Sequence, residues 1–330
     1  MALQIIKMFN SFKRAALLSI ILLGVGNVKA QKDPCTMIEP LSGGMTLTSN
    51  GNEDVGNGYY AEIWKYNTSS QGKMTVFGGE ADCAFKASWD ECGGFLAQVG
   101  YYDGKTTKTY KELGRISAEY CYTKSGSANS SYSPYSYIGV YGWTRDPLIE
   151  YYIVDDCFAG APAYIYGGIK IGDYPLDGET YDLYQVKRYM VPTIIGTANC
   201  TGLYAIRRAT RQCGHVSVSE HFKKWEELGI KLGKIYACRL LCEVSGGKGS
   251  IEYTYATMRW KGQTGHGIVF GDVNNDNAIT MADANAVVNY FLAADKPTDF
   301  KVDAADVNCD DDVTMADANQ IVNMFLGGAQ

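Results

Sequence analysis

Hydrophobic and polar positions alternate over short stretches through most of the chain. Between residues 46 and 258, runs rich in Tyr, Val, Ile and Thr are separated by glycine-containing turns. Examples are YYAEIW at 59–64, YSYIGVYGW at 135–143 and LIEYYIV at 148–154. Short strands of this composition are typical of antiparallel β proteins. The pattern therefore predicts an all-β fold, a β-sandwich or jelly roll.

One stretch departs from the strand pattern. Residues 219–228 (SEHFKKWEEL) carry apolar side chains at helical spacing, and either Ser217 or Ser219 is placed to cap the first turn. We expect a single amphipathic helix here, inserted among the strands.

The C-terminal segment, residues 268–330, contains a repeat of 34 residues. Residues 271–292 recur at 305–326, and 14 of the 22 aligned positions are identical. Each copy opens with a 12-residue loop and continues with apolar residues at helical spacing. Loop positions 1, 3, 5 and 12 carry oxygen-bearing side chains, which is the spacing that wraps a calcium ion. These candidate ligands are Asp272, Asn274, Asp276 and Asp283, then Asp306, Asn308, Asp310 and Asp317.

The repeat differs from a complete EF-hand. No helix is expected before either loop, and position 12 is Asp rather than Glu. Position 6, where Gly is usual, is Asn277 in the first copy and Asp311 in the second. We expect a small α-helical, EF-hand-like calcium module.

The N-terminal residues 1–30 have the pattern of an export signal. A basic start is followed by an apolar run at 15–23, and Val28 and Ala30 suit a signal peptidase. The apolar run is too short to span about 30 Å of hydrocarbon. We therefore expect cleavage after Ala30, a secreted, extracellular protein, and no membrane contact after cleavage. A segment at 31–45 and a short linker at 259–267 flank the central domain.

Charge is unevenly distributed along the chain. The whole sequence carries 30 Lys and Arg against 36 Asp and Glu, for a net charge of −6. Residues 268–330 alone hold 11 Asp and 2 Lys. A chain without a basic surface has little to displace counterions from phosphates, so nucleic acid is excluded as the main partner.

Ten cysteines face the oxidising compartment that export implies. No CxxC pair occurs, which argues against zinc ribbons and thioredoxin-like redox sites. Nine cysteines lie in the central part and one, Cys309, in the tail. At least one is therefore expected to be free or to pair across domains.

Two acidic residues interrupt otherwise apolar strands. Alternation in the run 148–154 places Glu150, Tyr152 and Val154 on one face, and Glu243 interrupts the run LLCEV. A carboxylate in such a strand is costly unless it is paired or catalytic. Two acids on strands that line one aromatic face suit glycosidic bond cleavage. The alternative is a structural ion pair with Arg145 or Arg188.

Three blocks resemble glycoside hydrolase family 11, the small jelly-roll endo-1,4-β-xylanases. The run YGWTRDPLIEYYIVD at 141–155 resembles that family's nucleophile strand. The runs YDLYQVKR at 181–188 and VPTIIG at 191–196 resemble its cord and thumb loop, and 216–233 matches its lone helix. The match runs in order through about 50–257, so 46–258 is expected to be the catalytic domain.

The resemblance implies a retaining mechanism with Glu150 as nucleophile and Glu243 as general acid/base, and no cofactor for catalysis. Tyr141 and Tyr152 would hydrogen-bond around the nucleophile and the sugar. Arg188 and Pro192 would hold substrate. Trp64 and Trp143 would serve as aromatic platforms.

The sequence departs from the family at three positions. The residue that tunes pH in this family, usually Asn or Asp, is Gly94 here. A substrate-binding Gln after the thumb is missing, because the run at 202–204 is GLY. The Glu-Gly-Tyr motif at the acid/base is Glu243-Val-Ser.

The tail closely resembles a dockerin, the module that joins cellulosomal enzymes to cohesin domains of a scaffoldin. By that resemblance, Met281-Ala282 and Met315-Ala316 lie on the recognition face, and their identity suggests two binding orientations. The expected function is a secreted endo-1,4-β-xylanase, anchored to a cohesin-bearing scaffold in a cellulosome-like complex. The alternatives are a β-1,4-glucanase on the related jelly roll and a catalytically inactive xylan-binding module.

Overall fold

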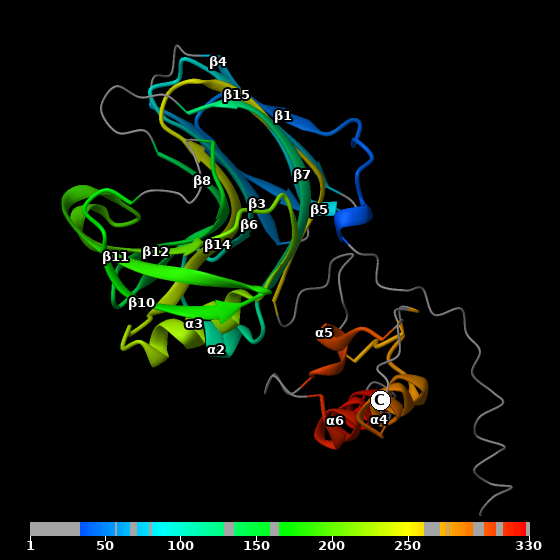
Figure 1. Ribbon diagram of the computed structural model, residues 1–330. Coiled ribbons are helices and arrows are strands. Elements are labelled where there is room, and N and C mark those ends of the chain that lie inside the picture. Colours follow the sequence, from blue (N-terminus) through cyan, green and yellow to red (C-terminus); the bar gives the residue numbers. More distant parts are fainter. Residues whose placement is uncertain are drawn as a thin grey trace, which may run out of the picture. The chain divides into compact units, whose positions relative to one another are not determined.

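The computed structural model describes residues 34–56, 58–66, 71–78, 81–128, 135–158, 165–260, 271–274, 276, 278–292, 300–307 and 313–327. It divides into a larger unit, Lys32–Gly267, and a smaller one that contains Ile268–Gln330 (Figure 1). The expected export signal at 1–30 and most of the linker at 259–267 lie outside the described residues. No helix within the described ranges is long and apolar enough to cross a membrane.

The larger unit is built from two β-sheets, so the all-β jelly-roll prediction is confirmed. One sheet has six strands in the order β1 (Met45–Leu47), β4 (Gln71–Gly78), β5 (Ala81–Asp90), β15 (Lys248–Arg259), β7 (Ser117–Ser127) and β13 (Cys213–Val216). The other has nine in the order β10 (Ile169–Leu176), β11 (Glu179–Thr193), β12 (Gly196–Arg207), β9 (Ile149–Asp156), β8 (Ser136–Arg145), β14 (Lys234–Val244), β6 (Phe95–Tyr102), β3 (Tyr59–Lys65) and β2 (Gly51–Gly56). Figure 1 shows their strands as two curved layers.

The main core lies between these two sheets. Phe85, Trp89 and Tyr253 of the six-stranded sheet and Val140 and Tyr151 of the nine-stranded sheet are almost fully buried in one cluster. Because side chains alternate along a strand, the residues between these positions point to the opposite face. We call that opposite face of the nine-stranded sheet, which carries Tyr141, Tyr152 and Glu243, the site face. It has its own aromatic cluster.

The expected helix is α3 (Val218–Glu227). Its Phe222 packs edge-on against Tyr151 of β9, with ring centroids 5.0 Å apart, so α3 covers the core side of the nine-stranded sheet. Ser217 is the N-terminal cap residue, but its hydroxyl donates to Asp177 at 2.7 Å instead of capping the helix. A second helix that the sequence reading did not anticipate, α2 (Tyr110–Leu113), begins with a capping box between Thr109 and Glu112.

One disulfide is present among the described cysteines. It joins Cys35, in the short 3-10 helix η1 (Pro34–Thr36), to Cys213 of β13. The thiols of Cys92, Cys121, Cys200, Cys238 and Cys242 are free, which agrees with the expectation of at least one unpaired cysteine. Cys309 lies outside the described residues.

The smaller unit contains two helices of the repeat, α4 (Met281–Leu292) and α6 (Met315–Gly327), which confirms a small helical module. A short helix, α5 (Val302–Ala305), directly precedes the second loop. The expectation that no helix precedes a loop was therefore wrong for the second copy. Val287 and Ile321, equivalent positions of the two copies, meet in one small core.

Candidate active site

Glu150 lies in the middle of the nine-stranded sheet, on β9 between β8 and β12. Its register partners are Trp143 on β8 and Gly202 on β12. Ile149 and Tyr151 point into the main core, so alternation turns Glu150 onto the site face. Its side chain is buried, with 8 % of its surface exposed. A carboxylate this buried needs donors around it.

Two tyrosine hydroxyls supply hydrogen bonds, and an arginine supplies a counter-charge to Oε2, which makes no hydrogen bond within the described residues. The hydroxyls of Tyr141 and Tyr152 donate to Oε1 of Glu150 at 3.1 Å and 3.2 Å. Nη1 of Arg188, from β11, contacts Oε2. The ladder between β11 and β12 shifts between Arg188 and Val191, and such an irregularity re-aims nearby side chains. The donors fix the orientation of the carboxylate and complement its negative charge.

Glu243 reaches the same face from β14, where its register partners are Tyr137 on β8 and Leu96 on β6. Burial raises the pKa of Glu243 from the ordinary 4.5 to about 7. A hydrogen bond with Tyr152 and the charge of Arg188 oppose that rise in pKa but do not cancel it. Its Oε2 is buried without a hydrogen-bond partner in the described structure. Glu243 is therefore a carboxyl able to carry a proton near neutral pH.

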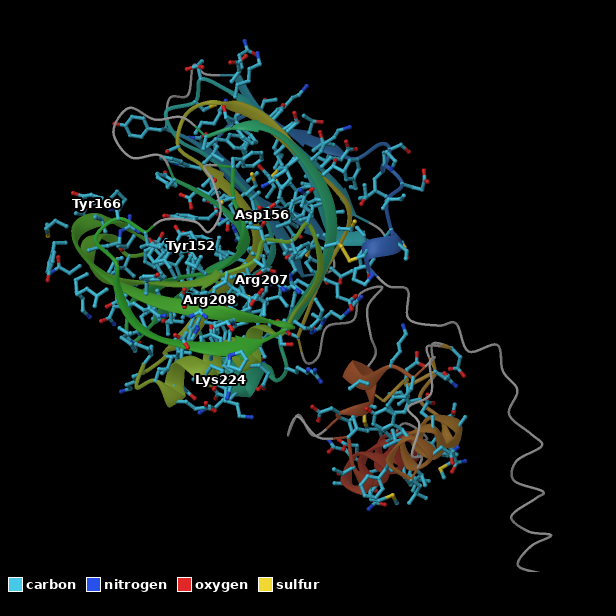
Figure 2. The ribbon with its side chains drawn as sticks, viewed as in Figure 1. Tyr152, Asp156, Tyr166, Arg207, Arg208 and Lys224 are labelled. Carbon is cyan, nitrogen blue, oxygen red and sulfur yellow. A yellow bond between two sulfur atoms is a disulfide. The ribbon has the colours of Figure 1, made fainter. Side chains whose placement is uncertain are left out.

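The two carboxyl groups thus have opposite environments while sharing Tyr152. Glu150 accepts hydrogen bonds from two tyrosines and pairs with a positive charge, whereas Glu243 is mainly desolvated. Two nearby carboxyls whose environments favour opposite protonation states can act as nucleophile and acid. Figure 2 labels Tyr152 among the crowded side chains of the larger unit.

The other expected substrate-binding residues, Trp64, Trp143 and Pro192, differ in how exposed they are. Trp64 on β3 leaves 43 % of its surface exposed, as a stacking platform requires. Trp143 is only 6 % exposed, and its Nε1 donates to the Tyr141 hydroxyl at 2.6 Å. The structure therefore does not support Trp143 as a platform and places it as a donor that orients Tyr141. Pro192 is exposed on the β11–β12 hairpin, opposite Thr197.

Tyr204 is a site residue that the sequence reading missed. Its ring stacks on Tyr152, with centroids 4.6 Å apart and planes 9° apart. Burial raises the pKa of Tyr204 to about 12, whereas the neighbouring Arg188 lowers it. A Cβ at Gly202 would lie 2.9 Å from the Tyr204 ring. The ring thus leans over the position where the family's Gln is missing, and its stacking on Tyr152 follows from the pairing of β12 with β9, where the two residues are register partners.

The candidate calcium ligands of the first loop are all described. Asp272 and Asp283 are buried, at 2 % and 0 % exposure. Oδ1 of Asp283 accepts from the backbone of Val273 at 2.8 Å, and Oδ2 accepts from Thr280 at 2.9 Å. The Asp276 amide donates to Asp272 Oδ1 at 3.0 Å.

In the second loop Asp306 and Asp317 are fully buried, whereas Asn308 and Asp310 lie outside the described residues. Within the described ranges no three His, Cys, Asp or Glu side chains converge on one point. The buried carboxylates are nevertheless the hard oxygen donors that calcium prefers, so the residues present fit that ion.

Two family models match the chain. The model of glycosyl hydrolases family 11 matches residues 56–254, and that of the dockerin type I domain matches residues 270–326.

Similar proteins include endo-1,4-beta-xylanase C of Fibrobacter succinogenes, which is 42 % identical over 71 % of this chain and 38 % of its own length. An endo-1,4-beta-xylanase of Neocallimastix patriciarum is 40 % identical over 76 % of this chain and 72 % of its own. Endo-1,4-beta-xylanase A of Bacillus pumilus is 40 % identical over 62 % of this chain and 82 % of its own. The chain thus spans well under half of the first relative and most of the other two.

Solved structures give the same picture. The crystal structure of wild-type ENZbleach xylanase superposes with a TM-score of 0.65 at 34 % identity. The superposition covers 70 % of this chain and 93 % of that one. The larger unit therefore shares both the sequence pattern and the fold of these proteins.

Proposed function

This chain belongs to glycosyl hydrolases family 11, and from that membership we propose that it is an endo-1,4-β-xylanase that hydrolyses internal β-1,4-xylosidic bonds of xylan. Its dockerin type I domain anchors it to a cohesin-bearing scaffold. The relatives named xylanases and the matching xylanase fold support this activity.

The reaction begins with the protonated Glu243 and the ionised Glu150. Glu243 donates its proton to the leaving glycosidic oxygen while Glu150 attacks the anomeric carbon, which forms a covalent xylosyl-enzyme. Glu243, now ionised, then accepts a proton from water. That water releases the sugar with retention of configuration and restores both carboxyl groups.

The surrounding residues hold the reacting groups in place. Tyr141, oriented by Trp143, and Tyr152 keep the Glu150 carboxylate aimed at one position. Arg188 neutralises charge beside Glu150 and, together with Pro192 on the same hairpin, contacts substrate. Trp64 provides an exposed ring on which a sugar stacks.

The observation that carries this proposal is the difference in environment between the Glu150 and Glu243 carboxyl groups. Glu150 accepts two tyrosine hydrogen bonds and forms an ion pair with Arg188, and Glu243 has a pKa raised to about 7 by burial. This division supports a nucleophile and a proton donor at neutral pH, and no metal or cofactor is needed in that reaction.

The test is Glu150→Gln, which keeps the shape of the side chain but removes the attacking oxygen anion. We expect a loss of xylan hydrolysis by at least about four orders of magnitude, with unchanged thermal unfolding. The assay is reducing-end release from xylan, with carboxymethylcellulose as the second substrate. Retained activity in Glu150→Gln would remove the nucleophile assignment, and a preference of the wild type for carboxymethylcellulose would make it a glucanase. Binding of xylan without hydrolysis by the wild type would make it a binding module.

The C-terminal module has a separate role. Ca²⁺ would be held by Asp272, Asn274, Asp276 and Asp283, and by the matching set Asp306, Asn308, Asp310 and Asp317. The ion supplies positive charge to loops rich in carboxylates and so stabilises the start of each helix. Met281 and Met315, exposed by 44 % and 40 % at these helix starts, present equivalent surfaces to a cohesin.

The proposed organisation is a signal peptide at 1–30, a segment at 31–45, the catalytic domain at 46–258, a linker at 259–267 and the dockerin at 268–330. The basic and apolar pattern of 1–30 supports secretion, and the dockerin match supports an extracellular multienzyme complex.

A further inference from the structure

The Arg188 guanidinium is held at two points. It pairs with Oε2 of Glu150, and it donates a hydrogen bond to the hydroxyl oxygen of Tyr204. The side chain is 33 % exposed and extends from β11 at an irregularity in the ladder with β12. Ordering a long arginine side chain costs rotamer entropy, so contacts at its far end are needed to fix one orientation. Tyr204 supplies a contact of this kind that is not itself a reacting group.

Tyr204 is firmly placed. Its buried ring lies parallel to the ring of Tyr152, and its centroid is 5.6 Å from that of Tyr137. Tyr152 in turn donates a hydrogen bond to Glu150. The Tyr204 hydroxyl is therefore fixed relative to the same tyrosine that holds the nucleophile.

Gly202 makes the contact between Arg188 and Tyr204 possible. On β12 it lies midway between Cys200, the register partner of Arg188, and Tyr204, and alternation puts all three positions on the site face. Arg188 therefore passes position 202 to reach the Tyr204 hydroxyl. A Cβ at Gly202 would lie 2.9 Å from the Tyr204 ring and 3.4 Å from its hydroxyl oxygen. A larger side chain there, such as the family's missing Gln, would displace the ring or obstruct the arginine.

We propose that Tyr204 is a positioning residue for the cleavage reaction, whose hydroxyl holds the Arg188 guanidinium against Oε2 of Glu150 while Gly202 keeps the path between them open. Tyr204 acts through Arg188 rather than on the reacting atoms. Without the hydroxyl, Arg188 keeps its charge but loses its fixed place beside the nucleophile. This role rests on the proposed xylanase function.

The decisive variant is Tyr204→Phe, which keeps the ring that stacks on Tyr152 and removes the hydroxyl oxygen. Since charge-assisted hydrogen bonds are about twice as strong as neutral ones, we expect kcat/KM on xylohexaose to fall about tenfold. The charge of Arg188 opposes the raised pKa of Glu243, so a loosened Arg188 should move the alkaline limb of the kcat/KM pH profile to higher pH. A merely structural role would lower activity without moving that limb.

Tyr255→Phe is the matched control. It also removes a hydroxyl bonded to a charged side chain, because the Tyr255 hydroxyl donates to Glu119 at 3.2 Å. Tyr255 lies on β15 of the six-stranded sheet, away from the site face. This variant should leave both kcat/KM and the pH profile unchanged.

Two further variants test whether the effect passes through Arg188. In an Arg188→Lys background, Tyr204→Phe should lower kcat/KM very little, because an ammonium group cannot make the guanidinium's two contacts at once. Gly202→Ala should lower kcat/KM and move the alkaline limb in the same direction as Tyr204→Phe. Combining Gly202→Ala with Tyr204→Phe should add little to either single change.

An unmoved alkaline limb in Tyr204→Phe, or fully additive losses in the Arg188→Lys background, would overturn the positioning role. Thermal unfolding of each variant checks that the fold is kept. A wild-type protein that does not cleave xylohexaose would instead refute the xylanase function itself. The two failures are therefore distinguishable.

Discussion

The two units bury carboxylates in different ways. In the larger unit Asp155 is 1 % exposed and accepts hydrogen bonds from Tyr181 at 2.6 Å and from Nε of Arg211 at 2.9 Å. In the smaller unit Asp283 is fully buried, and its recorded donors are backbone amides and a Thr280 hydroxyl, all neutral. The first unit carries its own cation into the core. The second holds 11 Asp and 2 Lys, and we propose that a cation from outside balances its buried carboxylates.

This difference has a functional meaning. A buried carboxylate that has its own counter-charge needs no ion from the medium, and such a pair is screened by salt much less than an exposed one. A small module whose core is formed by a few apolar residues, among them Val287 and Ile321, has little stability of its own. For such a module, the free energy of binding an ion becomes free energy of folding. We therefore expect calcium to control anchoring but not catalysis.

The largest expected effect is that of calcium removal. Chelation should unfold the smaller unit and abolish cohesin binding, because the two acidic loops repel themselves without the ion. All five Trp lie outside residues 268–330, so Trp fluorescence reports only on the larger unit. Far-UV circular dichroism should lose helical signal on chelation while Trp fluorescence and xylan hydrolysis stay constant. Undiminished cohesin affinity in chelator, measured by calorimetry, would contradict the calcium argument.

Most of the fold and most of the candidate site residues could be predicted from the sequence. The contacts that could not be predicted depend on which strands pair. Alternation put Glu150 and Tyr152 on one face, and the repeat identified Asp272 and Asp283. The stacking of Tyr204 on Tyr152 and the pairing of Glu62 with Arg239 join residues of different strands, a relation that no sequence spacing encodes. Residue type suggested a platform at Trp143, but its burial depends on neighbouring strands. The capping box that starts α2 has the sequence pattern of Thr109 and Glu112, but a helix of four residues is too short to show helical periodicity.

A second, smaller effect is expected from removing the internal cation of the larger unit. Arg211→Met leaves Asp155 buried without its charged partner, which should cost about 3–5 kcal/mol of unfolding free energy. Denaturant unfolding followed by Trp fluorescence measures this loss, and the smaller unit should be unaffected. Arg208→Met is the control, since Arg208 pairs with Asp173 and Asp182 at the surface. It should cost less than about 1 kcal/mol. Similar losses for both variants would show that burial is not what distinguishes them.

The smallest expected effect is a gradual pH dependence, which runs in opposite directions for catalysis by the larger unit and calcium binding by the smaller unit. Because Glu243 must be protonated to act as the acid and its pKa is about 7, kcat/KM on xylan should fall about tenfold per pH unit above that value. The smaller unit has the opposite limit, since carboxylates must be deprotonated to bind calcium, and anchoring should fail in acid.

The rise of the Glu243 pKa from 4.5 also affects the free energy of unfolding. The folded state holds a proton that the unfolded chain releases, so this contribution is fully present below pH 4.5 and is lost as the pH rises through about 7. Glu243→Gln should therefore flatten the pH dependence of unfolding over that interval, measured by Trp fluorescence in denaturant. An unaltered pH dependence of stability in Glu243→Gln would mean that another group carries the proton.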